Sequence, residues 1–175
     1  LPGNTEIQSD INYRIAKGMI FSVLYLDVDN FKAYNDAYGF SHGDRAIKLI
    51  GDILIDNVKA FGSRTDFIGH IGGDDFVVIT APECADVLCE NIIKDFDERV
   101  PELYTDADKT AGFISTTNRK GDITRYPIMT LSIAVVSNEH RVLQNHLQVG
   151  EIAAELKKKV KSITGSAYLK DRRRQ

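Results

Sequence analysis

Runs of apolar residues along the chain predict the strands of a buried sheet. Residues 21–26, 76–79 and 128–136 are almost wholly apolar and rich in β-branched and aromatic side chains, a pattern typical of central strands covered on both faces. Residues 67–71 form a shorter run that we also expect to be a strand, and residues 167–169 complete the set as an edge strand. The sequence therefore predicts a sheet whose middle strands are buried from both sides.

Apolar residues that recur every three or four positions predict helices between these strands. The expected helices span residues 5–18, 31–39, 44–61, 82–96 and 146–161. The last of them carries four lysines, which we place on its outer face: Lys157, Lys158, Lys159 and Lys161. Residues 101–127 are polar and lack a clear period, so they form either a long loop or an added hairpin.

Length and composition favour one globular domain, which we expect to span residues 1–175. A net charge of −3 argues against nucleic acid or direct membrane contact as a partner. We expect a cytoplasmic location, because the sequence shows no membrane-length apolar run or signal-peptide pattern. Cys84 and Cys89 lack metal-ligand spacing, and we interpret them as core residues in a reducing environment. The opening Leu1 in place of methionine suggests a domain excised from a longer multidomain or membrane-tethered signalling protein.

The turn at residues 72–75, Gly-Gly-Asp-Asp, lies between two of the expected strands and predicts a hairpin. Its two adjacent carboxylates, Asp74 and Asp75, repel each other, and stability alone would not select them. A bound cation would relieve that repulsion. The alternative is that both aspartates only solvate a loop.

A second acidic pair, Asp27 and Asp29, stands at the end of the first expected strand. Alternation places both side chains on the same face of that strand. An EF-hand loop is excluded, because its fifth, sixth and twelfth positions would be Phe31, Lys32 and Tyr38.

The two acidic segments together predict a metal site. If the first strand of the hairpin lies beside the strand that ends at Asp27, then Asp27, Asp74 and Asp75 converge. Three converging carboxylates need hard cations among them, and Mg²⁺ suits oxygen ligands and phosphate substrates. The helix that follows could hold phosphate oxygens through its first N–H groups and Lys32; a lysine on its own is far more often an ordinary surface residue, and the position of Lys32 next to the acidic cluster is what favours the phosphate role.

These motifs, taken jointly, resemble the GGDEF-domain family of diguanylate cyclases. The similarity rests on residues 27–39, the pair Gly43-Asp44 and residues 72–76, with weaker similarity in residues 130–134 and at the start of the chain. The resemblance implies an α/β fold, an α+β sandwich in which helices flank a central antiparallel sheet of ferredoxin-like βαββαβ topology, as in nucleotidyl cyclases and polymerase palms.

The resemblance also implies an enzyme that condenses two GTP molecules into cyclic di-GMP and releases pyrophosphate. The implied partners are GTP, a second copy of the domain in a catalytic homodimer, and an upstream sensory or regulatory domain. The implied metal site consists of Asp27, the Val28 carbonyl, Asp74 and Asp75 around Mg²⁺ or Mn²⁺. Asp74 is also the candidate base for the 3′-hydroxyl.

The implied substrate-binding residues are Phe31, Lys32, Asn35, Asp44 and Lys158. Asn35 and Asp44 would read guanine, because a carboxylate accepts hydrogen bonds from both N1–H and the 2-amino group. Lys32 and Lys158 would contact the phosphates.

Several positions depart from the family pattern. Asp75 replaces a longer glutamate, His70 and Ser162 stand where arginines are usual, and Phe40 replaces a histidine. These departures motivate an alternative, in which the domain is catalytically degenerate and binds GTP or another guanine nucleotide as a regulatory sensor.

The inhibitory product site of the family is incomplete in this sequence. It would need an arginine three residues before Asp66, where Ser63 stands, and Arg64 is displaced by one position. Only Asp66 remains, so we expect weak or absent product inhibition through this site.

Overall fold

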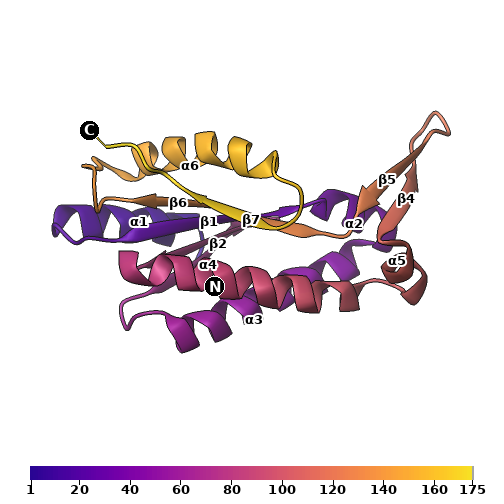
Figure 1. Cartoon of the computed structure of the whole chain (residues 1–175), viewed down its shortest axis with the longest axis horizontal. Helices are drawn as coiled ribbons and strands as arrows, with labels where there is room; N and C mark the ends of the chain where they lie inside the picture. Colours follow the sequence, from indigo (N-terminus) through magenta and orange to yellow (C-terminus); the bar gives the residue numbers. More distant parts are fainter. Residues whose placement is uncertain (175) are drawn as a thin grey trace.

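The computed structural model describes residues 1–174 as a five-stranded sheet with helices on both faces and a separate two-stranded hairpin (Figure 1). The strand order in the main sheet is β2-β3-β1-β6-β7. Its strands are β1 (Ser22–Asp29), β2 (Phe67–Gly72), β3 (Asp75–Thr80), β6 (Thr130–Ser137) and β7 (Ala167–Lys170). Each lies within a few residues of the position that the apolar runs predict.

The helices also follow the predicted pattern. They are α1 (Asn4–Ala16), α2 (Phe31–Tyr38), α3 (Phe40–Phe61), α4 (Pro82–Arg99) and α6 (His146–Lys161). The start of α3 differs from the expectation, because the helix begins four residues before Asp44. Gly39, with a φ of 91°, makes the sharp bend that separates α2 from α3, so almost no loop is needed between them.

The topology confirms the expected fold class. β1, β2, β3 and β6 pair antiparallel, and with the intervening helices they form the βαββαβ arrangement. β7 adds a parallel pairing to β6 at one edge, so the complete sheet is mixed.

Two helical layers cover the sheet (Figure 1). On one face, alternate residues of β1, β3 and β6 pack with α2, α3 and α4 in the larger core, which includes Leu26, Phe76 and Leu131. On the other face, Val23 and Val77 pack with α1 and α6. The alternation along β1 places Asp27 and Asp29 on the same face, as predicted. This is the face that α6 covers, since Lys161 of α6 contacts both carboxylates.

The register of the sheet corrects one expectation. The second strand of the hairpin, β3, lies beside β1, whereas we expected the first. In this register Asp27 is directly opposite Asp75. A buried central strand needs partners on both edges, and the more apolar β3 supplies one of them; β2 is partly exposed at the sheet edge.

Residues 100–127 form a folded unit, which includes the hairpin that was one of the two expected alternatives. It comprises a 3₁₀ turn (Val100–Leu103), α5 (Asp106–Ala111), β4 (Phe113–Thr117) and β5 (Ile123–Pro127). The β4–β5 hairpin projects away from the main sheet (Figure 1). Its base is fixed to α2 by stacked and edge-on rings of Tyr34, Tyr38 and Tyr104 and by a hydrogen bond from the Tyr34 hydroxyl to the Leu103 carbonyl.

Within residues 1–174, none of the helices combines the length and the apolar character that a membrane span requires.

Candidate functional site

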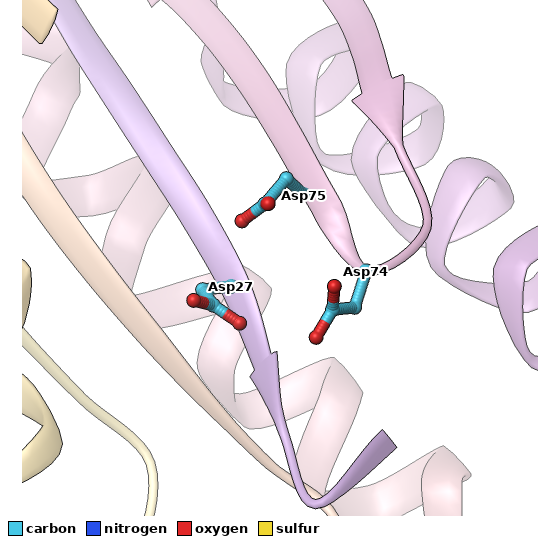
Figure 2. A group of neighbouring side chains, drawn as sticks. All are labelled: Asp27, Asp74 and Asp75. Carbon is cyan, nitrogen blue, oxygen red and sulfur yellow. The ribbon is translucent and has the colours of Figure 1, made fainter. Parts of the chain in front are cut away.

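Three carboxylates gather where β1 ends beside the β2–β3 turn. Asp27, Asp74 and Asp75 each offer an oxygen atom within 4.8 Å of the others. Figure 2 shows the three side chains grouped on one side of the two strands. Asp27 is only 9% exposed, so its charge is largely removed from water. The predicted convergence is therefore present.

Local backbone geometry holds the turn against β1. Gly73 has a φ of 53°, a conformation that favours glycine, and a bulge precedes it between His70 and Gly72. The Val28 N–H donates to the Asp74 carbonyl over 3.2 Å. The His70 ring stacks on Phe76, and its Nε2 lies 2.9 Å from the Gly73 carbonyl oxygen. The histidine that replaces the usual arginine thus supports the turn.

Two lysines of α6 neutralise part of the acidic charge. Lys157 Nζ lies 2.9 Å from Asp27 Oδ2 and 3.0 Å from Asp75 Oδ1. Lys161 Nζ lies 3.2 Å from the same Asp27 oxygen and 3.0 Å from Asp29 Oδ1. Lys157 therefore bridges Asp27 and Asp75, and Lys161 bridges Asp27 and Asp29.

The pKa directions follow from this crowding. Burial raises the pKa of the Asp74 carboxyl, and the negative charges of Asp27 and Asp75 raise it further. Burial alone would lower the pKa of Lys157, but hydrogen bonds and charge interactions with Asp27 and Asp75 prevail and raise it. The pKa of Lys161 is raised in the same way by Asp29 and Asp27. The crowded carboxylates thus attract positive charge, and the two lysines already supply part of it.

The residues present fit a divalent metal ion. The cluster supplies only oxygen ligands, and the raised pKa of Asp74 reflects its burial first and the charges of Asp27 and Asp75 second. Hard cations such as Mg²⁺ and Mn²⁺ take this donor set. Asp75 reaches the cluster despite being one methylene shorter than glutamate.

The predicted guanine-reading residues lie together at the α2–α3 junction. The side-chain oxygen of Asn35 is buried, and among the described residues it has no hydrogen-bond partner. A Cβ atom at Gly43 would lie 1.7 Å from that oxygen, so the amide fits only because position 43 lacks a side chain. The exposed Asp44 follows directly on α3. An unpartnered buried acceptor beside an exposed carboxylate indicates a place for a donor-rich ligand.

The other substrate-binding predictions occupy the start of α2 and the outside of α6. Phe31 is packed into the larger core, whereas Lys32 is exposed in the first turn of α2. Phe40, in the histidine position of the family pattern, is 81% exposed beside the Asn35 region. Lys158 is exposed on α6.

Sequence reasoning missed the roles of Lys157 and Lys161, which it placed on the outer face of α6. Lys157 is half-buried, and both lysines reach the acid cluster. The spacing could have revealed them, because they are four residues apart and each directly follows a residue of the buried stripe, Leu156 and Val160. Ser162, in the arginine position, donates instead to the Lys159 carbonyl at the end of the helix.

Asp66 lies at the other end of the hairpin, before β2. One of its carboxylate oxygens accepts from the Ser63 N–H at 2.9 Å and from the Thr80 hydroxyl at 2.9 Å, and the other accepts from the Ser63 hydroxyl. These local bonds give Asp66 a structural role at the end of α3.

Comparison with known proteins links this geometry to one family. The family model described as "Diguanylate cyclase, GGDEF domain" matches residues 4–162. Diguanylate cyclase DgcS of Shewanella oneidensis is 43% identical over 74 residues, which make up 41% of this chain and 24% of that protein. The bifunctional diguanylate cyclase/cyclic di-GMP phosphodiesterase MucR of Pseudomonas aeruginosa is 38% identical over 92 residues, 51% of this chain and 13% of that protein. The matched segment is thus about a quarter or less of these curated relatives.

Solved structures share the fold. The active GGEEF domain of a diguanylate cyclase from Vibrio cholerae superposes with a TM-score of 0.73 at 19% identity, covering 99% of each chain. Diguanylate cyclase SiaD from Pseudomonas aeruginosa, solved in complex with its activator SiaC, superposes with a TM-score of 0.71 at 17% identity, covering 98% of this chain and 59% of that one.

Proposed function

Since this chain belongs to the GGDEF-domain family, we propose that it is an active diguanylate cyclase, which condenses two GTP molecules into cyclic di-GMP and releases pyrophosphate. The observation that carries the proposal is the gathering of Asp27, Asp74 and Asp75 within 4.8 Å at the β1 end. Carboxylates held so close repel one another, and a purely structural role does not require them. Binding of a divalent metal ion that also contacts phosphate would explain why they are there.

The chain's own residues divide the work between two regions. Asn35 and Asp44 bind the guanine edge, where the Asn35 oxygen, which has no partner within the described part of the chain, accepts a donor of the base. Lys32, Lys158 and the first N–H groups of α2, next to Phe31, receive phosphate oxygens. Asp74 is the candidate base for the proton of the attacking 3′-hydroxyl.

A divalent ion, Mg²⁺ or Mn²⁺, would be held by Asp27, Asp74, Asp75 and the Val28 carbonyl, and when bound it would neutralise phosphate charge and acidify the 3′-hydroxyl. Each domain would bind one GTP, so the reaction requires two copies that face each other. We propose a cytoplasmic homodimer controlled by an upstream regulatory domain.

Turnover of GTP tests the proposal directly. The chain is fused behind a parallel coiled coil that supplies dimerisation, and it is incubated with GTP and Mg²⁺ or Mn²⁺. We expect cyclic di-GMP and pyrophosphate by chromatography and mass spectrometry. A folded, dimeric sample that forms neither product contradicts the proposal.

A catalytically silent guanine-nucleotide sensor is the second candidate. It is favoured by the ion pair that joins the shortened Asp75 to Lys157 and by the use of Ser162 to cap α6 in place of an arginine. Calorimetry distinguishes the two functions: tight GTP binding without turnover supports the sensor, and no guanine-nucleotide binding eliminates it.

A further inference from the structure

Two ammonium groups of the chain share one oxygen of the acid cluster. Lys157 and Lys161 both bond to Asp27 Oδ2, at 2.9 Å and 3.2 Å, and Lys157 also bonds to Asp75 Oδ1. Asp27 and Asp75 are two of the three carboxylates that gather in the cluster. The cations that the fold itself supplies therefore contact the same groups that a divalent ion would use.

A bare divalent ion meets a penalty at such a site. It adds two positive charges next to two ammonium groups that already hold the carboxylates, and the pairs are partly shielded from water, since Asp27 is 9% exposed. To bind, the ion must repel or displace the lysines, and displaced ammonium groups lose their hydrogen bonds.

A phosphate chain changes this balance. Its oxygens are charged acceptors that offer the lysines new partners of the same strength. Asp29 assists the exchange at Lys161: its Oδ2 is held by the hydroxyls of Thr130 and Ser132, and its Oδ1 lies 3.0 Å from the lysine. Lys161 therefore keeps one carboxylate partner when it leaves Asp27.

We propose that Lys157 and Lys161 are resident cations that exclude a bare divalent ion, and that metal and a polyphosphate ligand bind together. By thermodynamic linkage, each ligand then strengthens the other by the same factor. The identity of the polyphosphate as a nucleoside triphosphate rests on the proposed function. The exclusion of the bare ion rests only on the ion pairs.

Manganese binding without nucleotide tests the exclusion. Free Mn²⁺ is measured by electron paramagnetic resonance in titrations of the wild type, of Lys157→Gln/Lys161→Gln, and of Lys159→Gln as a control. Lys159 is an exposed lysine of the same helix. We expect the double variant to bind Mn²⁺ at least about tenfold more tightly than the wild type, and the control to match the wild type.

For nucleotide binding, the same double variant should change affinity in the opposite direction. With saturating Mg²⁺, a fluorescent non-hydrolysable GTP analogue should bind the double variant at least about tenfold more weakly. General damage to the fold would weaken both ligands, so tighter Mn²⁺ with weaker nucleotide is specific to the proposal. If the double variant does not fold, Lys157→Gln alone is compared, with the same two signs expected.

Unchanged or weaker Mn²⁺ binding in the folded lysine variant overturns the inference. Neither measurement involves turnover. A wild-type protein that produces no cyclic di-GMP would therefore count against the proposed function and leave the Mn²⁺ result to decide the inference.

Discussion

Both ends of the β2–β3 hairpin carry aspartates, but the aspartates are satisfied in different ways. At the turn, Asp74 and Asp75 crowd against Asp27, and the nearest positive charges come from α6, a distant part of the chain. At the other end, Asp66 accepts hydrogen bonds from neutral groups of Ser63 and Thr80. A carboxylate satisfied by fixed local donors stabilises the fold, whereas carboxylates balanced by charged side chains can exchange those partners for a ligand.

We expect the largest loss of activity from a substitution in the acid cluster beside the β2–β3 turn. Asp27→Asn removes one carboxylate from the cluster and the shared partner of both lysines. We expect cyclic di-GMP formation per folded protein to fall by about 10³-fold or more, because metal ligands contribute several kcal/mol to charge stabilisation in the transition state. Initial rates at saturating GTP measure this loss, and a variant that keeps wild-type turnover would show that the cluster has no role in catalysis.

A carboxylate in a third location, Asp44, sharpens the comparison because it lies exposed near the buried Asn35 oxygen, which has no hydrogen-bond partner among residues 1–174. Asp44→Ser should reduce the preference for GTP over ATP by about 1–3 kcal/mol, since serine cannot accept from two guanine donors at once. Competition binding of the two nucleotides measures the preference. An unchanged ratio would contradict the assignment of Asp44 to guanine.

Asp66→Ala should show the reverse behaviour, with a cost in stability and little change in turnover of the folded protein. The Ser63 N–H and the fully buried Thr80 hydroxyl lose their acceptor, which should lower the free energy of unfolding by about 1–3 kcal/mol. Urea denaturation measures the change. Loss of turnover without loss of stability would reverse the roles assigned to the two ends.

We expect the smallest change, a change in stability, at Asp171, whose carboxylate forms ion pairs with Arg141 and Arg173. Burial alone would raise the pKa of Asp171, but its bonds to Arg173 and Arg141 prevail and lower it. A lowered pKa means that the stabilisation is present above the pKa of the unfolded state, about 4, and is lost as the pH falls through the pKa of the folded state.

Asp171→Asn should therefore reduce stability by about 1 kcal/mol at neutral pH. The difference from the wild type should vanish under acidic conditions. Chemical denaturation at a series of pH values checks this, and a difference that persists in acid would show that the bonds do not depend on charge.

Much of the site could be predicted from the sequence because strand alternation and hairpin chemistry are local. Alternation placed Asp27 and Asp29 on one face, and the Gly-Gly turn brought Asp74 and Asp75 to a strand end. The choice of β3 over β2 as the neighbour of β1 could not be made locally, because it depends on which strand the whole sheet buries.

The contacts of α6 show a second limit. Helical period identifies a buried stripe but not which flanking residues face a charged group elsewhere in the fold. Lys157 and Lys161 flank the stripe, whereas the predicted Lys158 is turned toward solvent. The contact between Asp66 and Thr80 could not be predicted from the sequence either, because only the pairing of β2 with β3 brings Thr80 close to Asp66.

The tyrosine cluster under the β4–β5 hairpin limits how this domain can be shortened. Tyr104 belongs to the folded unit of residues 100–127, yet its ring packs against Tyr34 and Tyr38 on α2, the helix that also carries Lys32 and Asn35. Replacing the unit with a short loop would remove the Tyr104 contacts from one side of α2, and we expect α2 to be less rigid as a result. Residues 100–127 therefore support the helix that carries part of the proposed nucleotide site, and removing them should weaken that site.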